Sequence, residues 1–151
     1  MPTERTLVLI KPDAAVRGLT GFVLDRLEST GLLMSGAKLV RVTEALAREH
    51  YKQLSHQPFF NQLIDYLLGN LHGEKHHRVL ALVYQGENAI QKVRQLAGAT
   101  HPEKAEKTSL RGALGRVTAK GVIENILHAS SDSQEAEREI RLWFKPEELV
   151  L

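Results

Sequence analysis

The chain has 151 residues, of which 42% are hydrophobic and 25% charged, the balance of one globular domain with its own core. Its net charge is +2 and it has no cysteine, which excludes a disulfide framework and a thiolate metal site. No lysine–arginine block indicates a nucleic-acid track, and the first apolar run, TLVLI, is too short for a signal peptide or membrane span. We expect residues 1–151 to form a single domain, in a cytoplasmic protein.

The first half of the chain alternates strand-like and helix-like patterns. The short run Thr6–Ile10 is rich in β-branched residues and predicts a buried strand. A helix is predicted over Thr20–Thr30, and then a longer strand over Leu32–Val42, in which Gly36 is a candidate bulge. Two short helices are expected next, over Glu44–Leu54 and Phe60–Leu68.

The second half continues this alternation after a glycine-rich segment. Its predicted elements are a strand over Val79–Tyr84, a helix over Glu87–Ala97, a strand over Glu124–His128 and a helix over Gln134–Phe144. Two charged, glycine-containing segments, Gly69–Arg78 and Gly112–Gly121, are expected to be surface loops. The order predicts an α+β fold, a ferredoxin-like βαββαβ sandwich whose four-stranded antiparallel sheet is covered by helices.

Two features suit a nucleotide, although each also has a purely structural explanation. Lys11 directly follows the first predicted strand, where a cation suits a phosphate or a ribose hydroxyl. On position alone, an ordinary solvated lysine is favoured. Phe59 and Leu63 lie four residues apart at a helix start and make a stacking shelf for a flat ring. Core packing explains the same pattern equally well.

Three polar residues suit phosphate oxygens. Arg94 and Arg111 bring guanidinium forks, and Thr100 brings a hydroxyl donor. Scattered arginines are usually ordinary surface charges. The sequence has neither a G-x-x-x-x-G-K-[ST] loop nor a G-x-G-x-x-G loop, so a bound nucleotide has to be held by side chains.

His128 and Glu139 form a candidate catalytic pair. Ala136, Ile140 and Trp143 define the buried stripe of the last predicted helix, and Glu139 lies on or beside it. A carboxylate near an apolar face needs a partner, and His128 ends the strand that leads into this helix. Such a pair fixes the imidazole tautomer and frees the other nitrogen for attack. A structural pair is as plausible as a catalytic one.

Two details of the pattern stay open. Strand alternation puts Asn125 and His128 on opposite faces, so the backbone has to bend if both serve one site. His72, His76 and His77 lie in the glycine-rich segment, where a solvated loop is a better explanation than a metal site.

These motifs together resemble the nucleoside diphosphate kinase family over about residues 4–149. The segments that carry the resemblance are ERTLVLIKPDA, LAREHY, PFF, GENAIQKVRQLAGATHPEKA, LRG, NILHAS and AEREIRLWFKPEEL. The resemblance implies a ping-pong reaction that maintains NTP and dNTP pools. A nucleoside triphosphate, typically ATP, passes its γ-phosphate to a histidine and then to a nucleoside diphosphate, with Mg²⁺ carried by the nucleotide phosphates.

The resemblance also implies a role for each site residue. His128 falls at the phosphorylated histidine, which Glu139 and Ser130 support and Tyr51 orients. The positions of the implied nucleotide site are Lys11, Phe59, Leu63, Arg94, Thr100, Arg111 and Asn125. Among them, Phe59 stacks on the base, Lys11 and Asn125 hold the sugar and the reacting end, and the remaining polar residues neutralise the phosphates.

Several positions depart from the family pattern. Ala129 replaces a glycine and Ser131 an aspartate, whereas Ser130 is kept. The segment KTSLRGAL is altered, and the links around Gly69–Arg78 and Gly112–Gly121 are longer than usual. These changes leave open the structure of the loop that holds Arg111. They also leave open the number of subunits in the expected homo-oligomer, which is a hexamer, a tetramer or a dimer.

Two other function classes remain as alternatives to an active kinase. One is a catalytically weak, nucleotide-binding relative, which the altered segments suggest. The other is a small nucleic-acid-binding α+β domain, but the aromatic–glycine strand motif of such proteins is missing. The expected partners are therefore nucleotides and further copies of the chain, with no membrane and no specific nucleic acid.

Overall fold

The computed structural model describes residues 3–150. Its strands are β1 (Thr3–Ile10), β2 (Leu33–Val40), β3 (Val79–Glu87), β4 (Arg116–Val117), β5 (Ile123–Glu124) and β6 (Leu127–Ala129). Its α-helices are α1 (Pro12–Val16), α2 (Thr20–Glu28), α3 (Glu44–His50), α4 (Phe60–Leu68), α5 (Ala89–Ala97), α6 (Leu110–Leu114) and α7 (Ser133–Trp143). Short 3-10 helices lie over Lys52–Leu54, Glu74–His76, Pro102–Lys104 and Pro146–Glu148.

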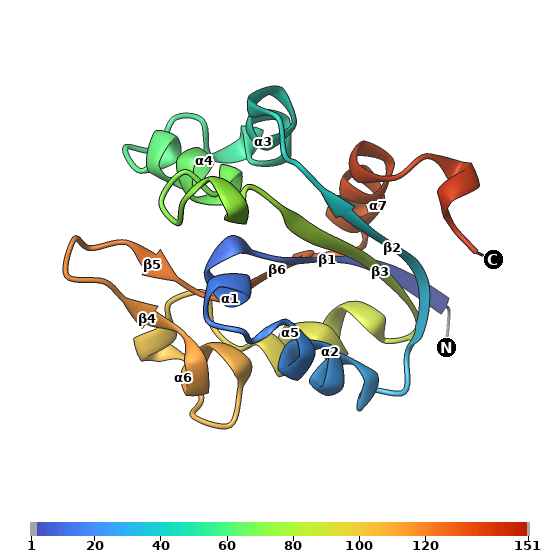
Figure 1. The fold of residues 1–151 in the computed structure, drawn as a ribbon. Coiled ribbons are helices and arrows are strands. Elements are labelled where there is room, and N and C mark those ends of the chain that lie inside the picture. Colours follow the sequence, from blue (N-terminus) through green and yellow to red (C-terminus); the bar gives the residue numbers. More distant parts are fainter. Residues whose placement is uncertain (1–2, 151) are drawn as a thin grey trace.

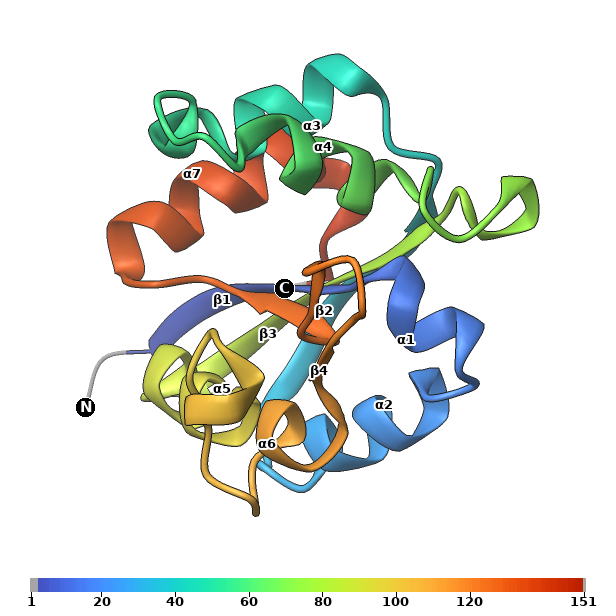
Figure 2. The same cartoon turned by 90° about the vertical axis from the view of Figure 1, so that its left-hand side faces the viewer.

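A four-stranded antiparallel sheet in the order β2-β3-β1-β6 forms the centre of the fold (Figure 1). Helices α3, α4 and α7 cover one face, and α2, α5 and α6 cover the other, as Figure 2 shows edge-on to the sheet. Alternate residues of β1 enter the two resulting cores: Leu7 and Leu9 pack on one side, Val8 and Ile10 on the other. The predicted ferredoxin-like sandwich is confirmed.

The expected bulge in the second strand is also confirmed. The pairing of β2 with β3 shifts register between Met34 and Gly36. A Cβ atom on Gly36 would lie 2.8 Å from Leu149 Cδ2 and 3.1 Å from the ring of Phe144. The absence of a side chain therefore lets the C-terminal segment pack against the bulged strand.

The prediction of one continuous strand over Glu124–His128 is wrong. The segment divides between β5 and β6, because Ile126 has a φ of 75° and Leu127 N donates to Asn125 O at 2.8 Å. These features define a γ-turn with positive φ, a conformation that is rare and strained for a β-branched residue. The turn provides the bend that Asn125 and His128 require to face one site.

The prediction of surface loops is confirmed for Gly69–Arg78, which is mostly exposed, and is wrong for Gly112–Gly121. Gly112–Gly121 contains the end of α6 and the start of a hairpin formed by β4 and β5. Gly69–Arg78 contains a 3-10 helix, and it carries His72, whose side chain is only 11% exposed because it pairs with Glu124. A solvated His72 was therefore the wrong expectation.

Candidate functional site

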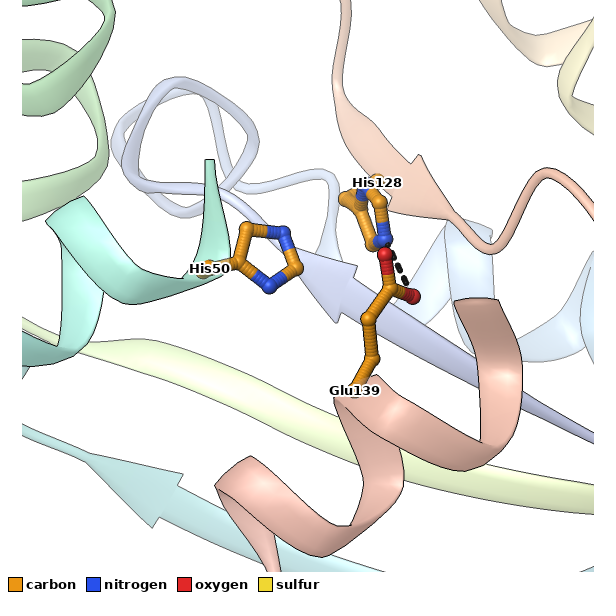
Figure 3. Close-up of side chains that lie close together, drawn as sticks. All are labelled: His50, His128 and Glu139. Carbon is orange, nitrogen blue, oxygen red and sulfur yellow. Dashed lines mark hydrogen bonds and ion pairs between the residues drawn. The ribbon is translucent and has the colours of Figure 1, made fainter. Parts of the chain in front are cut away.

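His128, Glu139 and Ser130 form a hydrogen-bonded chain where β6 meets α7. His128 Nε2 lies 2.9 Å from Glu139 Oε1, as Figure 3 shows, and Ser130 Oγ donates to the same oxygen at 2.7 Å. Ser130 in turn accepts from Leu7 N on the neighbouring strand at 3.1 Å. Because a carboxylate oxygen can only accept, His128 Nε2 carries the proton and Nδ1 keeps its lone pair.

The surroundings keep His128 neutral. Burial, followed by the nearby cations Lys11, Arg111 and Arg94, lowers the pKa of His128 well below its usual value. Burial raises the pKa of Glu139, although the hydrogen bond from Ser130 opposes this shift. The outcome is a neutral imidazole of fixed tautomer with a free nitrogen, which is the state a nucleophile needs.

His50 packs against the same imidazole, and apart from its place in the motif LAREHY nothing in the sequence marks it as part of the site. It ends α3, is 3% exposed, and its ring lies edge-on to that of His128 with centroids 4.4 Å apart (Figure 3). Trp143 Nε1 donates to His50 Nδ1 at 3.0 Å, which leaves the proton on Nε2, a buried atom that has no hydrogen-bond partner among residues 3–150. Burial lowers the pKa of His50, so that the ring stays neutral beside the nucleophile.

Lys11 and Asn125 are the second connected part of the site. Lys11 Nζ donates to Asn125 Oδ1 at 2.9 Å, and Asn125 Nδ2 donates to Thr100 O at 3.1 Å. Lys11 is 4% exposed; burial, and then the charge of Arg111, lowers its pKa to about 7. An incoming anion would offset this repulsion and hold the lysine in its charged form.

Arg111 is tied to the backbone around the γ-turn. Its guanidinium donates to three carbonyl oxygens: Asn125 O at 3.2 Å, Gly98 O at 2.9 Å and Leu127 O at 2.7 Å. Burial, and then the nearby Arg94, lowers its pKa to about 10, so it is charged at neutral pH. Arg111 therefore lies in a regular element, helix α6, whose N-cap residue Ser109 accepts a hydrogen bond from Gly112 N.

Asp13 also holds the γ-turn, a role that no pattern in the sequence indicates. One of its carboxylate oxygens accepts from Ile126 N at 3.1 Å, and the other accepts from the hydroxyl of Tyr66. Asp13 is fully buried, and Lys11 N donates to Ile126 O at 3.0 Å. The KPD motif therefore fixes the strained backbone between Asn125 and His128.

Four other predicted residues, Tyr51, Phe59, Leu63 and Arg94, have no side-chain hydrogen bond to His128 or Lys11 among the described residues. The Tyr51 ring lies edge-on to His128 with centroids 6.3 Å apart, and its pKa is raised by burial and by Glu139. Phe59 is 47% exposed at the start of α4, with the half-buried Leu63 one turn further. Arg94 is exposed on α5, and its charge helps to lower the pKa of His128. It lines an open cavity of about 890 Å³ that excludes both His128 and Lys11.

His50, His128 and Glu139 also have the composition of a metal site. Their ligand-type atoms all lie within 4.8 Å of one another, the one such group of three within residues 3–150. However, His50 Nε2 carries a proton, and Lys11 and Arg111 repel a cation at this point. The chemistry of the cluster fits a supported nucleophile that meets an anionic electrophile.

Comparison with known proteins places the chain in a family. A family model described as nucleoside diphosphate kinase matches residues 4–149. The nucleoside diphosphate kinase of Pyrococcus horikoshii is 44% identical over 147 residues, which cover 97% of this chain and 88% of that protein. The corresponding protein of Staphylococcus haemolyticus is 41% identical over 146 residues, or 97% of this chain and 91% of the relative.

Solved structures agree with these sequence matches. A nucleoside diphosphate kinase from Halobacterium salinarum, in complex with CDP, has a TM-score of 0.88 and 39% identity, with 99% of this chain and 93% of that chain covered. A transition-state mimic of the Borrelia burgdorferi enzyme, with bound vanadate and ADP, has a TM-score of 0.86 and 34% identity, covering 99% and 91%. The chain belongs to the nucleoside diphosphate kinase family.

Proposed function

We propose that this phosphotransferase passes the γ-phosphate of a nucleoside triphosphate to a nucleoside diphosphate through His128. In the first half-reaction, Nδ1 attacks the γ-phosphorus, a P–N bond forms, the bond to the bridging oxygen breaks, and the nucleoside diphosphate leaves with that electron pair. In the second, a terminal oxygen of another nucleoside diphosphate attacks the phosphohistidine and the P–N bond breaks. The carrying observation is the bond between His128 Nε2 and Glu139, which leaves Nδ1 free.

The remaining roles follow from the positions of the side chains. Lys11 and Asn125 lie together and suit the sugar and the transferring phosphoryl group. Arg94, Thr100 and the unused N–H groups of Arg111 neutralise the phosphates, because developing charge in this transfer is stabilised by preorganised donors. The exposed ring of Phe59, with Leu63, stacks on a base without reading its edge, which predicts broad base tolerance.

Magnesium fits this site as an ion that is bound by the phosphates of the nucleotide and not by the protein. The buried carboxylates of this region already have hydrogen-bond partners: Asp13 accepts from Tyr66 and Ile126, and Glu139 from His128 and Ser130. The other side chains are donors, which bind phosphate oxygens rather than a cation. Mg²⁺ keeps water ligands and binds phosphates readily, and when bound it supplies charge neutralisation for the transferred group.

A pulse and chase with labelled nucleotide tests the proposal. ATP labelled in its γ-phosphate, with Mg²⁺, is expected to leave an acid-labile, base-stable label on the protein. Addition of GDP is then expected to move the label to GTP, and chelation of Mg²⁺ before the pulse to prevent labelling. A wild-type protein that takes up no label would contradict the proposal and favour a binding protein.

We predict that Glu139→Gln slows labelling of His128 about 10- to 100-fold. The oxygen that accepts from His128 and Ser130 would then belong to a neutral amide, which holds the imidazole less strongly than a carboxylate does. The affinity for ADP should stay within about twofold, since Glu139 acts on the imidazole and not on the nucleotide. Rapid-quench labelling and calorimetry measure the two quantities. A labelling rate equal to that of the wild type would show that Glu139 does not orient His128.

Lys11 predicts a proton linked to nucleotide binding. With a pKa of about 7 in the empty site, Lys11 is mostly neutral at pH 8, and the phosphates of ADP should raise its pKa and charge it. Binding of ADP at pH 8 should therefore be accompanied by the uptake of about one proton, the number that a single neutral lysine can accept. Calorimetry in two buffers of different ionisation enthalpy measures this number. Lys11→Gln should abolish the uptake, and its persistence would assign the proton to another group.

Assembly and location are further parts of the proposal. Strand β2 lies at a sheet edge and exposes Leu33 and Leu39 by 63% and 59%, which favours a homo-oligomer built on that edge. Analytical ultracentrifugation of the wild type and of Leu39→Lys tests this expectation. Within residues 3–150, no helix is long and apolar enough to cross a membrane. The cysteine-free chain suits the reducing cytoplasm.

A further inference from the structure

Glu124 is a buried carboxylate outside the reacting group. It ends β5 and is only 3% exposed. Arg116 Nε, from the paired strand β4, donates to Oε1 at 2.6 Å, and His72 Nε2 donates to Oε2 at 2.8 Å. These contacts join residues 69–78 to the hairpin of β4 and β5, and both lie at the same end of the molecule in Figure 1.

The contact connects two walls of the proposed nucleotide site. On one side, Glu124 directly precedes Asn125, whose side chain holds Lys11. On the other side, His72 follows helix α4, and its ring packs against that of Tyr66 with centroids 5.9 Å apart. Lys11 Nζ lies 5.2 Å from the centre of the Tyr66 ring. The pair between His72 and Glu124 thus connects the residue before Asn125 to the tyrosine ring beside Lys11.

Charge explains why this carboxylate needs two partners. Burial alone would raise the pKa of Glu124, but the hydrogen bonds from His72 and Arg116 outweigh it and hold the pKa below its usual value. The charged carboxylate stands one residue before Asn125, in a site that receives a polyanion. Without its partners it would repel the phosphates and leave a buried charge unpaired.

We propose that Glu124, His72 and Arg116 form a clamp that positions Asn125 and thereby sets the affinity for nucleotides. This inference rests on the proposed function of the site. The three residues of the clamp act through Asn125 and Lys11 and take no part in bond making. Residues 69–78 and the hairpin of β4 and β5 accordingly brace the nucleotide site, and loss of the clamp should affect nucleotide binding much more than the transfer step.

Binding of ADP to the unphosphorylated protein tests the clamp, because no transfer takes place in that complex. Glu124→Gln and His72→Ala should each weaken ADP binding about tenfold, in the range seen when supporting residues of a site are changed. Labelling of His128 at saturating ATP should stay within about twofold of the wild-type rate, which separates positioning from chemistry. The double variant should be no weaker than the poorer single variant, because both changes break one unit.

Matched controls come from the same two segments. Lys75→Gln and Lys120→Gln change exposed lysines and should bind ADP as the wild type does. Urea unfolding of every variant separates a loss of fold from a loss of positioning, and Arg116→Gln, at a side chain that is 55% exposed, gives a milder break of the clamp. Lower stability with unchanged ADP affinity, or additive losses in the double variant, would overturn the clamp. A wild type that never labels would instead overturn the kinase reaction itself.

Discussion

Replacing His128 by glutamine should reduce phosphoryl transfer by at least about 10⁴-fold, the scale seen when a catalytic nucleophile is removed. The variant should still bind ADP, because the groups around Lys11 and Asn125 make their contacts without the imidazole. The glutamine amide can donate to Glu139, so the buried carboxylate keeps a partner. Steady-state transfer from ATP to GDP measures the effect.

His56→Gln is the matched control for this prediction. His56 is an exposed histidine whose ring contacts its neighbour Gln57, and its replacement should leave both transfer and labelling unchanged. Residual label on His128→Gln, at a level comparable with the wild type, would mean that another side chain carries the phosphate.

Arg111→Leu should reduce the free energy of unfolding by about 3–5 kcal/mol, because it leaves three backbone carbonyls near the γ-turn without their charged donor. ADP binding should weaken as well, since the turn positions Asn125. Arg111→Lys should lose less stability, because an ammonium keeps the charge but cannot match the planar fork of the guanidinium. Urea unfolding and calorimetry measure the two effects.

Arg94→Leu distinguishes two functions of the arginines in this site, stabilisation of the fold and binding of phosphates. Arg94 is exposed on α5, and the structure gives it an electrostatic influence on His128 and Arg111. Its loss should weaken nucleotide binding and change stability by less than about 0.5 kcal/mol, as is usual for exposed positions. Equal losses of stability in Arg94→Leu and Arg111→Leu would contradict the structural role of Arg111.

The order of elements was accessible from sequence because the apolar patterns of β1, β3 and α7 are strong and local. The pairing of His128 with Glu139 was accessible for a related reason: a carboxylate beside the buried stripe of α7 required a partner. The spacing alone leaves a structural pair and a catalytic pair equally open. The resemblance to the family favours the catalytic pair, with His128 as the nucleophile and Glu139 as its support.

The geometry between Asn125 and His128 was inaccessible because it depends on Ile126. A β-branched residue is among the least suited to positive φ, so no local propensity predicts the γ-turn. The turn is stabilised by Asp13, which lies 113 residues away in the chain. Tertiary contacts therefore override the local strand pattern, and a continuous strand was the natural but wrong expectation.

The partners of the remaining polar residues were hidden for the same reason. Arg111 looked like a phosphate ligand alone, yet its donors are directed at carbonyls that only the folded chain brings together. His72 looked solvated because Glu124, its partner, lies 52 residues further on. A buried hydrogen-bonded pair of residues so far apart in the chain has no signal in a single sequence.

The position of the phosphate on the imidazole is the most direct test of the account. The wild-type protein, labelled with ¹⁵N in histidine and phosphorylated by ATP, can be examined by NMR for coupling between phosphorus and each ring nitrogen. Because Nε2 is committed to Glu139, we predict that the phosphate is on Nδ1 of His128. A phosphate on Nε2, or on another residue, would contradict the proposed mechanism.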